Sequence, residues 1–271
     1  PPKTGSTWLY QVLTQHPDVF VPELKDLYFF DRHYDRGLAW YAKQFSESDG
    51  AVAVGEISHD YLYSPEACDR ICRDLQDVKL ITILRNPTHR AISHYKYSRR
   101  FGNVTGSFLQ ATRQNPNILD CGLYAKHLRP FIDSFPREQL GVFFFDDLQH
   151  DPTELGQRLF RFLGLDETYP VECNRKVNGQ AVSRSVWISR AARTGAHLTR
   201  KLGWTALLGK AKNSSFLRQV LFREVTTSDS ADFDLDGAED LCRDFYADDM
   251  SRLSRILGGH QPPWLKHRSA V

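Results

Sequence analysis

Short apolar runs rich in β-branched residues alternate along this chain with longer segments of helical periodicity. Three of the runs, residues 51–57, 78–84 and 140–145, are bounded by polar or turn-forming residues. Apolar runs of this length without polar alternation are typical of strands that are buried on both faces. The sequence therefore predicts three buried strands, of which Val78–Leu84 is the strongest.

In the segments around these runs, apolar residues recur three or four positions apart, as they do on one face of a helix. Proline at the first turn favours a helix that begins at Pro87, and Gly164 is a typical helix end. The helices that we predict cover residues 5–15, 37–45, 64–75, 87–100, 122–135, 151–163 and 236–257. The expected apolar face of the last helix consists of Leu241, Phe245, Leu253 and Ile256.

This alternation of strands and helices predicts an α/β fold, with a parallel sheet that carries helices on both faces. No internal repeat or low-complexity linker interrupts residues 1–271, so we expect a single domain. A strand–loop–helix unit needs an apolar strand ahead of its loop, and the chain has none before Pro1. We expect that first strand of the sheet to lie upstream of Pro1.

Charge and composition narrow the class of protein only slightly. The formal net charge of +2 gives no argument for a nucleic-acid partner, and we expect none. The sequence contains no run of eighteen apolar residues, so it predicts no transmembrane helix. Five scattered cysteines without a Cys-x-x-Cys pair favour a reduced, cytoplasmic protein, with the Golgi lumen as the alternative if an anchor precedes the chain.

The opening stretch "PPKTGSTWL" has the residue types of a phosphate-binding loop in an unusual order. The triphosphate loop G-x-x-x-x-G-K-[ST] has its lysine after the last glycine, whereas Lys3 precedes Gly5 here. The amides of Gly5, Ser6 and Thr7 open a predicted helix, where free N–H groups favour an anion. The alternative is a capping turn that carries a surface lysine.

A second stretch with potential chemistry, "LRNPTHRAISHY", directly follows the strongest predicted strand. Arg85 stands at the end of that strand, and Ser93 lies eight residues further along, in the following helix. A guanidinium group and a hydroxyl together suit a phosphate monoester, because arginine pairs with two of its oxygens. The alternative is a structural pair between Arg85 and an aspartate, with Ser93 filling the helix face.

Together, these stretches resemble the sulfotransferases that use 3′-phosphoadenosine 5′-phosphosulfate (PAPS). "PKTGSTWL" resembles their 5′-phosphosulfate loop, and "LRNPTHRAISHY" resembles their 3′-phosphate motif R-[ND]-P-x-x-R-x-x-S-x-[YW]. "HPDVFVPELKDLYFFD", "RKVNGQAVSRS" and "FYADDMSRLSRILG" resemble further segments of the bacterial and heparan-type members. The matching stretches span nearly the whole chain.

This resemblance implies a P-loop-like parallel sheet and transfer of a sulfuryl group from PAPS to a hydroxyl of a carbohydrate, lipid or small molecule, without a metal. Lys3 would stabilise the charge that develops on the bridging oxygen. The donor-binding residues that it implies are Lys3, Thr4, Gly5, Ser6, Thr7, Trp8, Arg85, Ser93, Asn178, Gly179 and Arg184. The histidines form no metal-ligand pattern such as His-Glu-x-x-His.

The family usually also needs a base that accepts the proton of the acceptor hydroxyl. Heparan-type members have a glutamate before the double phenylalanine, and the matching position here holds Asp26, which is one methylene shorter. Glu56, at the end of the run "AVAVGEI", is the second candidate for this catalytic role. His59 and His33 are further options, and Asp26 could instead be a solvated loop acid.

A basic segment runs from Arg184 to Arg223 and contains no aspartate or glutamate. It could contact an anionic membrane surface or an acidic polymer, or it could be a solvated helical excursion. Two other functions remain open at this point: a protein that binds the nucleotide without turnover, and a P-loop phosphotransferase.

Overall fold

The computed structural model describes residues 2–172, 181–183, 222–224, 233–258 and 261–266. β1 (Val19–Phe20) pairs with β2 (Ala53–Val54), and β3 (Leu80–Leu84) pairs with β4 (Leu140–Phe144), in parallel in both cases. β5 (Ala181–Ser183) and β6 (Phe222–Glu224) form an antiparallel pair. Parallel strands joined by helical connections confirm the predicted α/β class.

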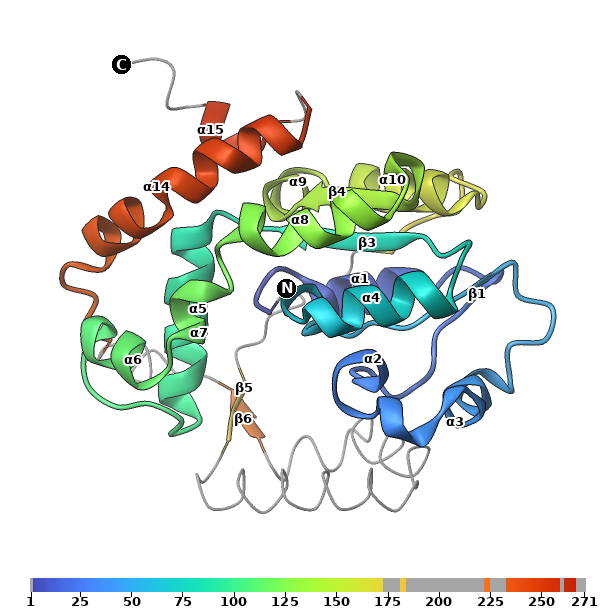
Figure 1. Cartoon of the computed structure of the whole chain (residues 1–271), viewed down its shortest axis with the longest axis horizontal. Coiled ribbons are helices and arrows are strands. Elements are labelled where there is room, and N and C mark those ends of the chain that lie inside the picture. The colour runs from blue at the N-terminus through green and yellow to red at the C-terminus, as the bar shows by residue number, and fades with distance from the viewer. Residues whose placement is uncertain (1, 173–180, 184–221, 225–232, 259–260, 267–271) are drawn as a thin grey trace.

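Helices make up most of the described chain (Figure 1). The α-helices are α1 (Ser6–Leu13), α2 (Phe29–Arg32), α3 (Leu38–Ala42), α4 (Pro65–Asp74), α5 (Pro87–Arg100), α6 (Phe108–Gln114), α7 (Asn117–Asp120), α8 (Tyr124–Ser134), α9 (Phe145–His150), α10 (Pro152–Leu163), α14 (Ala238–Ile256) and α15 (Pro263–Lys266). Short 3₁₀ turns cover Tyr34–Arg36, Lys43–Phe45, Tyr61–Tyr63 and Arg137–Gln139.

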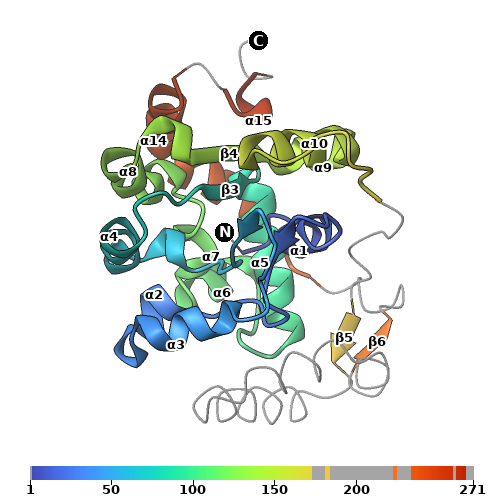
Figure 2. The ribbon, with the colours of Figure 1, turned by 90° about the vertical axis from the view of Figure 1, so that its right-hand side faces the viewer.

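The helices cover both faces of the β3–β4 pair, as the sequence predicts. Figure 2 shows β3 and β4 with α4 and α8 on one side and α1 and α10 on the other. The apolar residues of α1 and α10 form one core with Ile83 and Phe143. Those of α5, α8 and α14 form a second core with Leu84 and Phe144. Successive strand residues therefore bury their side chains in opposite directions.

α5 has the predicted bounds, and local chemistry explains why. Pro87 occupies its first turn, where the missing N–H removes no hydrogen bond. The Asn86 side chain caps the helix by accepting hydrogen bonds from the amides of Thr88 (3.0 Å) and His89 (3.2 Å). This capped junction fixes how α5 leaves the end of β3.

The prediction of a buried strand over residues 51–57 is wrong in its length and in part of its burial. β2 contains only Ala53 and Val54, and the exposed fractions of Val52 and Val54 are 68% and 47%. The described part of β2 pairs only with β1. Its side chains therefore lack the cover on both faces that a central parallel strand has.

A cavity of about 1170 Å³ lies between β2 and β3. Its body is apolar and is lined by residues 53–57, residues 80–83 and side chains of α1 and α8. The strand that we expect upstream of Pro1 stays a prediction.

The buried face of α14 differs from the predicted one. Leu253 is buried, but Phe245 is 41% exposed, and Cys242, Tyr246 and Met250 are buried instead. A polar contact explains why α14 is rotated about its axis relative to the prediction. Asp249 lies on the buried side, where its carboxylate accepts hydrogen bonds from the first-turn amides of α8, at residues 125 (2.9 Å) and 126 (3.0 Å).

Candidate active site

The N-terminal loop turns sharply into α1 at Gly5. Gly5 has a φ of 102°, a left-handed conformation that residues with a Cβ rarely adopt. A Cβ here would also lie 3.0 Å from Leu148 Cδ2. The amides of Ser6 and Thr7 open the helix and have no acceptor within it, because helical hydrogen bonds reach back four residues. This end of α1 is therefore suited to an anion.

Arg85, at the end of β3, holds the same loop in place. Its Nη1 donates a hydrogen bond to the Lys3 carbonyl at 3.2 Å. Its guanidinium lies over the ring of Phe145, 4.5 Å from the centroid, and the Lys3 ammonium lies 4.6 Å from the ring centroid of Tyr97 on α5. The two stretches that the sequence marks for phosphate chemistry, far apart in the chain, thus meet at one place.

Several positively charged side chains lie close together where the N-terminal loop contacts Arg85. Burial lowers the pKa of Lys3, and the charges of Arg85 and Arg100 lower it further. Burial also lowers the pKa of Arg85, and Arg90 acts in the same direction. Burial, Arg90 and Lys3 together lower the pKa of His94 to about 4, so this imidazole is neutral at neutral pH. Cations this close repel one another, and a phosphate-bearing ligand would offset that repulsion.

Ser93 lies on α5, half-buried, two turns beyond Arg85 in the chain. Tyr97 follows it by four residues, which places both side chains on the same face of the helix. Because Tyr97 contacts the Lys3 ammonium, this face of α5 is turned toward the N-terminal loop. Ser93 therefore shares the face of α5 that carries Tyr97, and its role at the 3′-phosphate stays a prediction.

Asp26 forms a short pair with His59, which the sequence did not predict. Asp26 Oδ1 lies 2.6 Å from His59 Nδ1, and the two side chains are 21% and 27% exposed. The other imidazole nitrogen lies 3.2 Å from a carboxylate oxygen of Asp60 and 3.5 Å from the Tyr28 hydroxyl. His33 follows α2 at its far end. The carboxylate and the imidazole that sequence reasoning named separately therefore form one unit.

The segment that carries Asp26 lies beside the phosphate loop. Lys25 Nζ donates a hydrogen bond to the Ser6 carbonyl at 3.4 Å. Burial lowers the pKa of Lys25, while the charge of Asp26 acts in the opposite direction. This contact joins the residue before Asp26 to the first residue of α1, so a carboxylate lies next to the cationic end of the helix.

Strained backbone conformations occur in the N-terminal loop and in the segment that carries Asp26. Among the described residues other than glycine, only Lys3, Asp26 and Tyr28 have a positive φ, at 70°, 62° and 52°. Such conformations cost about 1–3 kcal/mol each and persist where the surrounding structure enforces them, as functional sites often do. The strain therefore marks the loop and the Asp26 segment independently of their residue types.

Glu56, the second base candidate, has a different environment. Its Oε1 accepts a hydrogen bond from the Tyr61 hydroxyl at 2.6 Å, and its Oε2 accepts one from the Ser58 hydroxyl at 2.7 Å. Burial raises the pKa of Glu56 to about 7, against the lowering effect of these hydrogen bonds. Both oxygens of Glu56 therefore already have a hydrogen-bond partner within the protein.

Comparison with known proteins accounts for this combination of a phosphate loop, a cationic cluster and a carboxylate. Residues 1–199, well over half of the chain, match the sulfotransferase domain. The chain belongs to the sulfotransferase domain family. This membership confirms the resemblance of its motifs and implies PAPS as the co-substrate, for which the cationic cluster at Lys3 and Arg85 is suited.

Among curated sulfotransferases, the chain is 36% identical over 174 residues to heparan sulfate glucosamine 3-O-sulfotransferase 3B1 of Homo sapiens, with 60% of this chain and 44% of that protein covered. It is 29% identical over 187 residues to the Homo sapiens bifunctional heparan sulfate N-deacetylase/N-sulfotransferase 3, with 61% and 21% covered. The matched part thus spans less than half the length of these relatives.

Among solved structures, a sulfotransferase from Alicyclobacillus acidocaldarius has a similar fold. The TM-score is 0.59 at 24% sequence identity, and the match covers 76% of this chain and 92% of that chain. This likeness confirms the fold and its single-domain α/β organisation.

Some of the residues expected to bind the donor of this sulfotransferase are buried, and others lie outside the described residues. Thr4 and Trp8 are buried, with exposed fractions of 1% and 3%, and their predicted contacts with the donor stay predictions. Asn178, Gly179 and Arg184 lie outside the described residues, as does most of the basic segment from 184 to 223.

The described residues contain neither a metal-binding cluster nor a membrane-spanning helix. No group of three or more histidine, cysteine or carboxylate side chains there could hold a metal ion. No helix in the same part of the chain is long and apolar enough to cross a membrane.

Proposed function

We propose that this protein transfers a sulfuryl group from PAPS to a hydroxyl group of a glycan. The observation that carries this proposal is the contact between the Lys3 loop and Arg85, which unites two phosphate-binding motifs beside a carboxylate. Membership of the sulfotransferase domain family supports the reaction. The heparan sulfate enzymes among the relatives support a glycan acceptor.

In this proposal, the donor is held at both of its phosphate ends. The amides at the beginning of α1 and the hydroxyls of Ser6 and Thr7 bind the 5′-phosphosulfate, while Arg85 and Ser93 bind the 3′-phosphate. Lys3 faces the bridging oxygen. Negative charge grows on that oxygen as its bond to sulfur breaks, so the ammonium stabilises the transition state more than the bound donor.

The acceptor proton goes to Asp26. The acceptor oxygen forms a bond to sulfur, the bond between sulfur and the bridging oxygen breaks, and adenosine 3′,5′-bisphosphate leaves. Asp26 is better placed for this role than Glu56, because its side chain is 21% exposed and its neighbour Lys25 contacts the phosphate loop. The His59 ring orients the carboxylate through the 2.6 Å contact.

Nucleotide binding tests the donor site. The full-length protein should bind adenosine 3′,5′-bisphosphate more tightly than 5′-AMP, because only the former carries the phosphate that Arg85 and Ser93 would hold. Hydrogen bonds to a charged group contribute about 1.5–3 kcal/mol, which is roughly 10- to 150-fold in affinity. Isothermal titration calorimetry would measure both dissociation constants.

Arg85→Ala should erase most of that preference, and Ser93→Ala should reduce it. Arg129→Ala is the matched control, since Arg129 is exposed and pairs with Asp133 on α8. Equal affinity of the unmodified protein for the two nucleotides would refute the assignment of the 3′-phosphate site.

A further inference from the structure

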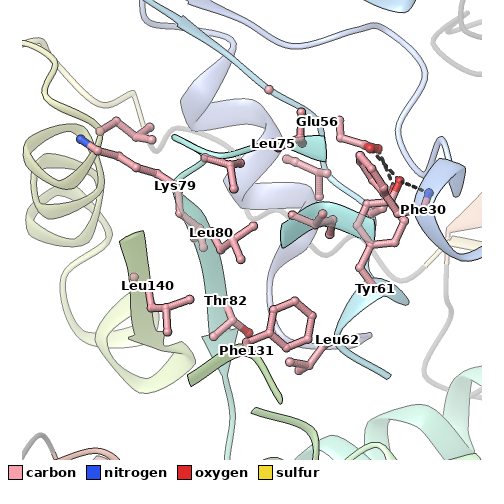
Figure 3. A pocket seen from close by; sticks show the side chains of 18 of the residues that line it. Phe30, Glu56, Tyr61, Leu62, Leu75, Lys79, Leu80, Thr82, Phe131 and Leu140 are labelled. Atoms are coloured by element: carbon pink, nitrogen blue, oxygen red, sulfur yellow. Dashed lines mark hydrogen bonds between the residues drawn. The ribbon is translucent and has the colours of Figure 1, made fainter. Parts of the chain in front are cut away.

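A small hydrogen-bonded network links Glu56, which follows β2, to the segment that carries Asp26. The carboxylate of Glu56 accepts hydrogen bonds from the hydroxyls of Ser58 (2.7 Å) and Tyr61 (2.6 Å). Figure 3 shows Glu56 and Tyr61 joined in this way, with the amide of Phe30 on the far side of the tyrosine hydroxyl.

The same two hydroxyls accept hydrogen bonds from the backbone at the beginning of α2. Ser58 Oγ accepts from the amide of Tyr28 at 3.3 Å, and Tyr61 Oη accepts from the amides of Phe29 (2.9 Å) and Phe30 (3.4 Å). Tyr28 caps α2 without a side-chain hydrogen bond of its own. The network therefore satisfies first-turn amides that a capping side chain would normally pair.

This support acts on strained backbone. Asp26 and Tyr28 hold φ angles of 62° and 52°, which residues with a Cβ adopt only when their surroundings enforce it. The Asp26 amide also donates to the Ile57 carbonyl at 2.9 Å. Residues 57–61 thus determine the backbone path on both sides of Asp26, and Glu56 fixes two of the side chains that do so.

We propose that Glu56 is a positioning residue: through the hydroxyls of Ser58 and Tyr61 it fixes the backbone of residues 28–30, and thereby the direction of the Asp26 carboxylate. This inference rests on the proposed function, since it takes Asp26 as the proton acceptor. It assigns Glu56 no contact with the substrate. Burial raises the pKa of Glu56 and the charge of Asp26 acts in the same direction, as expected of an enclosed carboxylate near the Asp26 segment.

The test removes the hydroxyl link and leaves the carboxylate of Glu56 in place. Tyr61→Phe and Ser58→Ala are made in the full-length protein, each alone and combined with Asp26→Asn. Tyr63→Phe is the matched control, because it deletes a hydroxyl from the same 3₁₀ turn that bonds to the Cys121 carbonyl instead (3.1 Å). For each variant, kcat for labelled sulfuryl transfer to a heparan oligosaccharide and the Kd for adenosine 3′,5′-bisphosphate are measured.

We expect Tyr61→Phe to lower kcat by roughly 10²-fold, because a displacement of about 1 Å at a catalytic group has an effect of that size. Ser58→Ala should lower kcat in the same direction. The nucleotide Kd should stay unchanged in both variants, and Tyr63→Phe should keep its kcat. When Tyr61→Phe or Ser58→Ala is combined with Asp26→Asn, kcat should fall no further than in Asp26→Asn alone. The carboxylate that the two hydroxyls position is then already absent.

A Tyr61→Phe variant with the kcat of Tyr63→Phe would overturn the inference. So would an equal further loss in the Asp26→Asn background, which would mean that the network does not act through Asp26. If Tyr61→Phe does not fold, Ser58→Ala decides between the same outcomes. Absence of transfer by the unmodified protein would instead refute the proposed function, so the two failures are distinguishable.

Discussion

Replacing Glu56 by glutamine should change how the stability of the protein depends on pH. Burial raises the pKa of Glu56 to about 7, whereas an exposed glutamate has a pKa of 4.5. Between those two values, the folded protein keeps a proton that the unfolded chain releases. The contribution of this group to stability is therefore greatest below about pH 4.5 and is lost as the pH rises through about 7.

The size of this effect follows from the shift. A difference of about 2.5 pKa units corresponds to roughly 3 kcal/mol, at about 1.4 kcal/mol for each unit. Glutamine does not ionise, so Glu56→Gln does not lose this contribution to stability as the pH rises. Between about pH 4.5 and pH 8, the free energy of unfolding of Glu56→Gln should therefore rise by roughly 3 kcal/mol relative to that of the unmodified protein.

Urea denaturation followed by far-ultraviolet circular dichroism at a series of pH values would measure this difference. Other titrating groups contribute to both proteins and cancel in the comparison. Glu138→Gln, a substitution at an exposed glutamate, is the control and should show no such rise. A difference between Glu56→Gln and the unmodified protein that stays constant over the pH range would refute the argument from burial.

Three further predictions concern other parts of the protein. Lys3→Ala should lower kcat by about 10²–10³ while donor affinity stays nearly unchanged, because the charge it stabilises appears only in the transition state; unchanged kcat with weak donor binding in steady-state kinetics would contradict this role. Asp249→Ala should lower the free energy of unfolding by about 1–3 kcal/mol in urea titrations, because it leaves two amides of α8 without their acceptor; an unchanged midpoint would contradict the capping role. Retention of the protein on a heparin column through its basic segment, residues 184–223, should fall steeply with salt, since exposed charges are screened beyond about 8 Å at physiological ionic strength; retention that ignores salt would refute an electrostatic contact.

Elements whose ends carry a chemical marker were predictable from the sequence. α5 begins at Pro87 behind the Asn86 cap and ends where its periodicity ends, as predicted. The closeness of the N-terminal loop to Arg85 agrees with the resemblance of both stretches to phosphate-binding motifs, because Arg85 directly follows β3 and ligands of such sheets bind at the carboxyl ends of the strands.

The parts that depend on contacts distant in sequence were not predictable. Asp26 and His59 were named as separate candidates, but their pairing depends on the backbone path around β2 and on a left-handed conformation at Asp26 that no residue type signals. The rotation of α14 was missed for a similar reason. From the sequence alone, Asp249 is expected at the surface. It is buried because its carboxylate accepts hydrogen bonds from two amides of α8.

Mass-spectrometric detection of isotope-labelled sulfuryl transfer from PAPS to heparan oligosaccharides by the full-length protein would test the proposed reaction itself. We expect a sulfated product and an equal amount of adenosine 3′,5′-bisphosphate. Asp26→Asn should lower this transfer by roughly 10²–10⁴ with unchanged nucleotide affinity, as loss of a general base does. Asp26→Glu should retain activity. A protein that binds the nucleotide but transfers no label, or an Asp26→Asn variant that transfers it at the normal rate, would contradict the proposed function.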